Sequence, residues 1–138
     1  MEPSILEEEA VSSVLATRRL AVLEAFLSAW NAHDVHRLMD CMAENCVFHS
    51  SAGPGAEGTS FFGRDAVRLS YVSLLETFPK ANWTNGRHYV LGEIGLSTWR
   101  FIGVGKDGII LEVDGCDIFS FVGELIASKD SYRKMRSG

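Results

Sequence analysis

The sequence lacks the features of secreted, zinc-binding and nucleic-acid-binding proteins. Its three cysteines, Cys41, Cys46 and Cys116, have no C-x-x-C spacing, so neither a disulfide framework nor a metal site is expected. With 13 basic against 18 acidic residues, the chain has no excess of positive charge for nucleic-acid phosphates. The start, MEPSILEEEA, carries three consecutive glutamates where a secretory signal needs basic and apolar residues, and no run approaches about 18 uncharged apolar residues. We therefore expect a soluble cytoplasmic protein that binds neither membrane nor nucleic acid.

The residues that are present are typical of one packed globular domain. The chain has 138 residues, of which 46% are hydrophobic and 22% charged, with only three prolines. A chain of this length buries roughly 65–70% of its unfolded surface, which suffices for a hydrophobic core. We expect a single domain over residues 1–138, with residues 1–12 as a candidate N-terminal extension. Gly103 and Gly105 are not followed by a helix, so no dinucleotide cofactor site is expected.

The first half of the sequence has a helical pattern. Apolar residues recur at three- and four-residue steps over residues 13–30, which predicts an amphipathic helix. Asp34 is a good N-cap for a short second helix over about residues 35–43. A third helix is predicted over about residues 65–77, and Pro79 ends it.

The second half has the pattern of short strands separated by tight turns. Turn-forming dipeptides occur at Gly92-Glu93, Asp107-Gly108 and Gly123-Glu124. Strands are predicted over residues 46–49, 81–91, 96–105, 109–121 and 125–133. The turn-rich segment over residues 50–63 is a candidate lid over a pocket. Helices followed by a meander predict an α+β fold.

Several short motifs resemble one known family. In chain order they are Phe26-Leu-Ser-Ala-Trp30-Asn31-Ala-His-Asp34, Ala43-Glu-Asn-Cys-Val47-Phe48, Gly63-Arg-Asp-Ala-Val67, Phe78-Pro79 and Gly115-Cys-Asp117-Ile-Phe119-Ser-Phe121. They resemble the SnoaL-like branch of the nuclear transport factor 2-like superfamily, to which ketosteroid isomerase is similar in layout. The resemblance implies a cone in which three N-terminal helices pack on a strongly curved, mostly antiparallel sheet. It also implies an apolar pocket at the wide end of the cone.

The resemblance selects Asp117 as the catalytic candidate and implies no cofactor. Asp117 matches the second aspartate of ketosteroid isomerase and the basic aspartate of SnoaL-type polyketide cyclases. Ser50 stands where the isomerase has its general base, and Phe26 stands where it has its oxyanion-hole tyrosine.

The alternation of side chains along a strand selects Asp117 independently. Counting in steps of two over residues 109–121 places it on one face with Val113 and Phe119, so one carboxylate lies in an apolar row. A poorly hydrated carboxylate there is suited to taking a proton from a carbon acid. Two alternatives remain open: a bulge at Gly115 would turn Asp117 toward solvent, or Asp117 caps a buried backbone group.

Arg100 is placed by the turn that precedes this strand. If Asp107-Gly108 forms a two-residue turn, Arg100 falls on the face of Asp117, while Trp99 and Phe101 fall on the other face. An Arg100–Asp117 ion pair is then within reach. A turn one residue longer reverses each of these assignments.

The remaining candidates are a histidine, a serine and a set of aromatic residues. His49 ends the first strand, where it can act as an acid or base beside Ser50, and a packing role is the alternative. The candidates for contact with a substrate are Phe26, Trp30, Tyr71, Trp99, Arg100 and Phe119, although each aromatic residue also suits the core. His88 is interpreted as structural, and the basic run 129–136 as a solvated last strand and tail.

Two functions remain open on the sequence. The first is a cofactor-independent enzyme for proton transfer of the isomerase, cyclase or dehydratase type, on a small hydrophobic ketone, polyketide-like or steroid-like compound. In it Asp117 moves the proton and His49 or Ser50 assists. The second is a non-catalytic domain that binds a small hydrophobic ligand.

A homodimer through the sheet is also expected. The predicted alternation puts large apolar residues on both faces of the hairpin 96–121, namely Trp99, Phe101, Val113 and Phe119. One cone encloses only one face, and the other would then need a partner.

Overall fold

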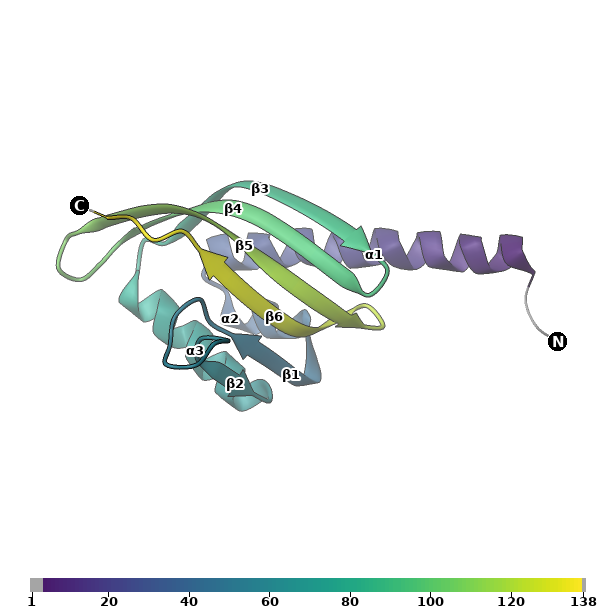
Figure 1. The fold of residues 1–138 in the computed structure, drawn as a ribbon, viewed down its shortest axis with the longest axis horizontal. Helices are drawn as coiled ribbons and strands as arrows, with labels where there is room; N and C mark the ends of the chain where they lie inside the picture. The colour runs from purple at the N-terminus through teal and green to yellow at the C-terminus, as the bar shows by residue number, and fades with distance from the viewer. Residues whose placement is uncertain (1–3, 138) are drawn as a thin grey trace.

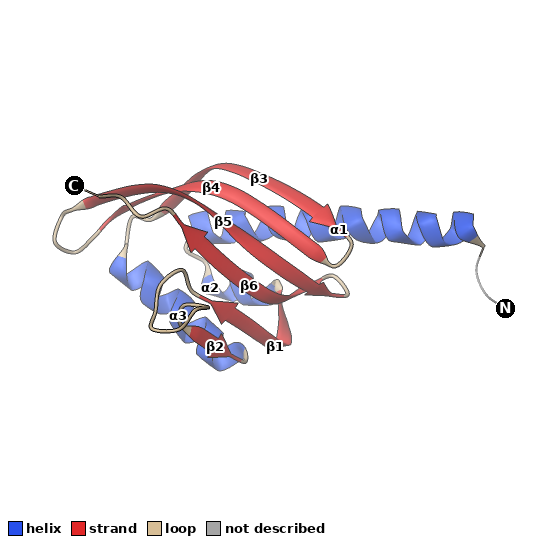
Figure 2. Ribbon diagram, in the orientation of Figure 1, coloured by secondary structure: helices blue, strands red, loops and turns tan. Residues whose placement is uncertain are grey.

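A curved six-stranded sheet carries helices on one side in the computed structural model, which describes residues 4–137 (Figures 1 and 2). Within that range the elements are α1 (Ile5–Asn31), α2 (Val35–Asp40), β1 (Met42–His49), β2 (Ser60–Phe62), α3 (Arg64–Thr77), β3 (Asn82–Leu91), β4 (Ile94–Val104), β5 (Ile110–Val122) and β6 (Leu125–Arg133). The strand order is β2-β1-β6-β5-β4-β3. Only β1 and β6 pair in parallel among these neighbours. The predicted α+β class and mostly antiparallel sheet are confirmed, but α2 is short and α3 follows the first two strands instead of preceding the sheet.

Helix α1 begins at Ile5, earlier than the predicted start at residue 13. The Ser4 hydroxyl accepts a hydrogen bond from the Glu7 amide, and the Glu7 carboxylate accepts one from the Ser4 amide, which forms a capping box. Residues 5–12, the candidate extension, therefore continue the helix beyond the sheet (Figure 1), and residues 1–3 lie outside the described part. No helix within residues 4–137 is both long enough and apolar enough to cross a membrane.

The second predicted helix is too long, and the first predicted strand is too short. Helix α2 ends at Asp40, and β1 begins at Met42, because the chain there pairs with β6: the Ile126 amide donates to the Cys41 carbonyl. The guanidinium of Arg64 donates to the carbonyls of Met39 and Met42 and holds this junction. The candidate lid segment contains a further strand, β2, that pattern alone did not predict.

The turn between β4 and β5 is one residue longer than predicted. Val104 pairs with Ile110, and the Gly105 amide donates to the Ile109 carbonyl, so three residues form the loop. Gly108 takes the left-handed φ of 81° that this loop needs. The register then runs without a shift to the far end of β4, which excludes a bulge at Gly115. The alternation predicted for β5 is therefore correct, and that predicted for β4 is reversed.

A β-bulge in β6 places two more polar residues on the inner face of the sheet. Phe121 pairs with Ile126 but Ser120 pairs with Ser128, so Ala127 is the extra residue. Beyond the bulge, Lys129 is turned into the protein, where it is only 6% exposed. The interpretation of the last strand as solvated is wrong at this position.

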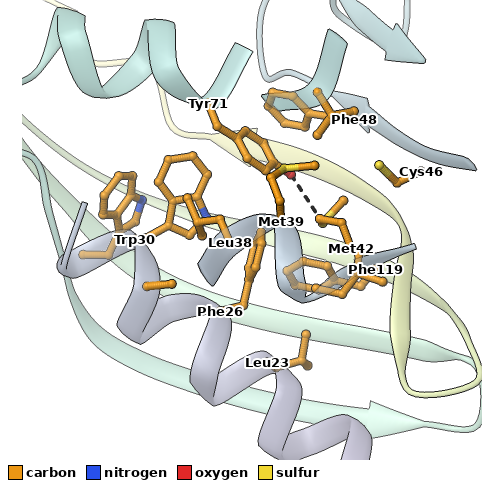
Figure 3. Close-up of a cluster of buried hydrophobic side chains, with 14 of the residues drawn as sticks. Leu23, Phe26, Trp30, Leu38, Met39, Met42, Cys46, Phe48, Tyr71 and Phe119 are labelled. Carbon is orange, nitrogen blue, oxygen red and sulfur yellow. Dashed lines mark hydrogen bonds between the residues drawn. The ribbon is translucent and has the colours of Figure 1, made fainter. Parts of the chain in front are cut away.

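The core lies between the inner face of the sheet and the helices. Phe26 contacts Trp30, Tyr71 and Phe119 edge to face, and Figure 3 shows these rings in one cluster. Near the middle of α1, the guanidinium of Arg19 donates at 2.7–2.8 Å to the carbonyls of two hairpin turns, β3–β4 and β5–β6. The first helix is thus attached to the sheet at both ends of their contact.

Candidate functional site

A cavity of about 620 Å³ lies between the inner face of the sheet and helices α1 and α3. This volume falls in the range of small-molecule sites. Its apolar wall is formed by side chains from both layers, among them Leu23, Phe26, Leu27, Trp30, Phe48, Leu69, Leu74, Phe78, Trp83, Trp99, Phe101 and Phe119. The predicted lid segment borders the cavity through Ser51, Ala52 and Thr59. A ligand held there would be in contact mainly with aromatic rings.

A polar row crosses four strands of this otherwise apolar face. His88 pairs with Ser97, Ser97 with Asp117, and Asp117 with Ser131, so the four residues stand side by side on β3, β4, β5 and β6. All four line the cavity. The strand register alone therefore brings a histidine, two hydroxyls and a carboxylate to one wall.

Asp117 is buried at 6% exposure and is in contact with two hydrogen-bond donors and one ammonium group. Trp99 Nε1 donates to its Oδ2 at 2.9 Å, and Ser131 Oγ donates to its Oδ1 at 2.5 Å. Lys129 Nζ lies 3.6 Å from Oδ1. These contacts stabilise the ionised carboxylate in a place where water does not hydrate it freely.

Lys129 has the most unusual environment in the cavity. Its Nζ donates to Ser131 Oγ at 3.0 Å and lies 4.4 Å from the ring centroid of Phe48. The ring centroids of Trp30 and Tyr71 are 5.3 and 5.5 Å away. Burial lowers the pKa of Lys129 below its usual range, while the nearby Asp117 carboxylate raises it in part.

Gly115 allows Trp99 to reach Asp117. A Cβ at this position would lie 2.5 Å from the Trp99 ring and 2.5 Å from the Tyr132 carbonyl oxygen. The indole therefore lies flat over the backbone of β5, and its Nε1 points to the carboxylate two residues on. Any side chain at residue 115 would displace this hydrogen-bond donor.

His88 belongs to the site, against the interpretation that it is only structural. Its Nδ1 lies 2.7 Å from Ser97 Oγ, and the ring lines the cavity. Burial lowers the pKa of His88, with Glu24 and Asp117 opposing the shift, so the neutral imidazole is the main form near pH 7. A neutral imidazole can accept a proton or donate one.

Six of the predicted site residues line the cavity: Phe26, Trp30, Ser50, Trp99, Asp117 and Phe119. Ser50 stands at the rim, where its hydroxyl donates to the Ala52 carbonyl and accepts from the Thr59 amide. That hydroxyl thus stabilises the loop next to the cavity.

Three predicted site residues lie elsewhere. Arg100 is exposed on the outer face and forms a bidentate pair with Asp114, because the longer β4–β5 turn reverses the alternation of β4. His49 follows the inward-facing Phe48 and points away from the cavity, where its Nδ1 lies 2.7 Å from Ser60 Oγ. Tyr71 lies in the core behind the cavity wall, and its hydroxyl donates to the Met42 sulfur (Figure 3).

Four polar residues that line the cavity were not predicted as site residues from the sequence: His88, Ser97, Lys129 and Ser131. The alternation of β4 depends on the β4–β5 turn, and that of β6 depends on the bulge at Ala127. No motif in the sequence marks either of them. Over residues 4–137, no group of three or more His, Cys, Asp or Glu side chains is arranged to hold a metal ion.

The fold and the cavity define a class of protein: an α+β domain whose curved sheet and helices border an apolar pocket. The chain belongs to the SnoaL-like domain family, whose model matches residues 23–129. The sequence motifs had indicated this family. No curated protein matches the sequence.

Solved structures share this fold at low sequence identity. A candidate polyketide cyclase from Pseudomonas putida has a TM-score of 0.76 at 12% identity, over 85% of this chain and 92% of that one. One from Xanthomonas campestris pv. campestris has 0.75 at 16%, over 85% and 90%. A ketosteroid isomerase-like fold from Catenulispora acidiphila, in complex with trimethylamine, has 0.71 at 18%, over 80% and 83%. At these identities the likeness establishes the fold alone.

Proposed function

We propose that this protein binds a small apolar carbonyl compound in the cavity and transfers a proton at the carbon next to the carbonyl group. Asp117 takes the proton, and the ammonium of Lys129 stabilises the negative charge that develops on the carbonyl oxygen. The names of the two cyclase-like neighbours are compatible with chemistry of this kind. No cofactor takes part in this proposal.

The observation that carries the proposal is the buried Asp117–Lys129 pair at the wall of an apolar cavity. A buried ion pair is seldom a gain in stability over apolar residues of similar size, so its presence in a pocket favours a chemical role. Trp99 and Ser131 hold the carboxylate in one orientation, as a general base requires. In a cavity with little water, the charge of Lys129 acts strongly on a nearby oxygen.

A non-catalytic binding domain is the second candidate. It is favoured by the contacts of Asp117, because Trp99, Ser131 and Lys129 already occupy its two oxygens and leave the carboxylate less free to approach a carbon acid. In that case the polar row anchors a polar group of the ligand and the aromatic wall supplies the affinity.

Exchange of hydrogen for deuterium tests the proposed reaction without knowledge of the natural substrate. We expect the protein to speed up exchange of the protons next to the carbonyl of small cyclic ketones, such as cyclohexanone and larger fused-ring analogues, in D₂O. Proton NMR follows the loss of signal, with a heat-unfolded sample as the blank. If a ketone binds, as seen by shifted amide resonances of cavity residues, and exchanges only at the blank rate, the protein is a binding domain.

We also propose a homodimer through the outer face of the sheet. The prediction that large apolar residues of the hairpin 96–121 occupy both of its faces is wrong. The inner face holds all four of them: Trp99, Phe101, Val113 and Phe119. The outer face nevertheless exposes other large apolar residues, namely Tyr89, Leu91, Ile94 and Ile118.

Sedimentation measures the proposed association directly. We expect a dimer at micromolar concentration, and a monomer after Ile118→Glu, because a charge at the centre of an apolar contact is costly to bury. Val11→Glu, at an exposed residue of α1 beyond the sheet, is the matched control and should leave the dimer intact. A wild-type monomer at that concentration would contradict the proposal.

A further inference from the structure

We propose that Lys129 is a nucleophile that forms an imine with an aldehyde or ketone bound in the cavity. This inference rests on the proposed function, since it uses the same cavity and the same carbonyl group. It changes the role of Lys129 from a fixed charge to a covalent partner of the ligand.

The position of Lys129 distinguishes it from the other lysines of the chain. The sequence contains four lysines, and Lys80, Lys106 and Lys134 are all exposed. Lys129 alone among them is buried, and it lines the cavity. A carbonyl compound that enters the cavity therefore meets one amine, held on an apolar wall.

The groups around Lys129 are suited to moving protons to and from its amine. Asp117 faces it from β5 at 3.6 Å, and Ser131 accepts its hydrogen bond at 3.0 Å. From the other packed elements it meets ring faces: Trp30 of α1, Phe48 of β1 and the phenol of Tyr71 of α3. Arg133, further along β6, is the other charged group that acts on it.

The chemistry balances without an added reactant. The Lys129 ammonium passes one proton to Asp117, and its free amine attacks the carbonyl carbon to form a carbinolamine. Asp117 then returns the proton to the carbinolamine hydroxyl, which leaves as water as the C=N bond forms. The products are a protonated imine and one water, and Asp117 is a carboxylate again beside the new positive charge.

This arrangement also accounts for the proximity of Asp117. A protonated imine withdraws electrons from the adjacent carbon more strongly than a carbonyl group does. Loss of a proton from that carbon to Asp117 then becomes easier. The covalent step deepens the proposed proton transfer and needs no second base.

Reductive trapping tests the proposal on the wild-type chain. The protein is incubated at pH 7 with benzaldehyde and sodium cyanoborohydride, and the benzylated positions are mapped by peptide mass spectrometry. Burial lowers the pKa of Lys129, so a larger share of its amine is unprotonated and nucleophilic than burial-free surroundings would allow. We expect Lys129 to react at least about tenfold faster than Lys80, Lys106 or Lys134. The amino terminus, with an ordinary pKa of about 8, is the internal reference for rate.

Lys129→Arg separates the covalent role from an electrostatic one. Arginine keeps the positive charge beside Asp117 but forms no imine under these conditions, so we expect both labelling at residue 129 and ketone exchange in D₂O to be lost. Lys134→Arg is the matched control and should keep both.

Each outcome of the two measurements is decisive. If exchange persists in wild type while Lys129 stays unlabelled, the imine is excluded and the proposed proton transfer stands. If Lys129 is labelled selectively without exchange, the imine site stands and the proposed reaction fails. If neither occurs, both fail. Because trapping is done on the wild-type chain, a variant that folds poorly does not affect this result.

Discussion

Replacing Asp117 by Asn lowers the rate of ketone exchange by about 10²-fold or more, which is the contribution expected of a general base. Asparagine has nearly the same shape, and its carbonyl oxygen can still accept the hydrogen bond from Trp99 Nε1. It cannot take up the proton. The loss should therefore appear in the rate, while the affinity for the ketone changes only a few-fold.

Asp114→Asn is the matched control for this experiment. Asp114 lies on the same strand, but its side chain is exposed on the outer face and paired with Arg100. The substitution removes the same charge, so a general electrostatic effect would appear in both variants. We expect the exchange rate of Asp114→Asn to match that of wild type. If Asp117→Asn also exchanges at the wild-type rate, Asp117 is not the base, and the binding-domain function replaces the proposal.

Replacing Lys129 by Met lowers the free energy of unfolding at pH 7 by about 3–5 kcal/mol, the usual cost of removing one partner of a buried ion pair. Methionine fills a similar volume between the rings of Phe48 and Trp30. The cost arises because the Asp117 carboxylate stays buried without its cation, with hydrogen bonds only from Trp99 and Ser131. Urea unfolding measures the change.

The double variant Asp117→Asn with Lys129→Met tests the cause of that loss. Once the carboxylate is removed as well, most of the lost stability should return, since no unpaired charge remains in the cavity wall. Lys134→Met, at an exposed position, should stay within about 0.5 kcal/mol of wild type. If Lys129→Met is as stable as wild type, the pair is not coupled as the geometry indicates.

The class of fold could be predicted from the sequence, and the inward face was the favoured placement for Asp117. The apolar spacing of the helices, the turn dipeptides and the family motifs each depend on neighbouring residues, and such local patterns can be read without coordinates. Asp117 was placed correctly because the alternation from Val113 to Phe119 lies within one regular strand. The predicted boundaries failed where pairing between distant strands decided them, as for β1, which begins at Met42 because it pairs with β6.

The residues that stand beside Asp117 could not be predicted, because they depend on the register of neighbouring strands. Side chains alternate with a period of two, so a single extra residue in a turn or a bulge reverses the faces of the whole strand that follows. The three-residue β4–β5 loop turned Trp99 inward and Arg100 outward, and the extra Ala127 brought Lys129 and Ser131 into the cavity. The Asp107-Gly108 pair is compatible with a two-residue and with a three-residue loop, and no motif marks the bulge at Ala127. The base candidate could therefore be identified from the sequence, whereas its cation and its hydrogen-bond donors could not.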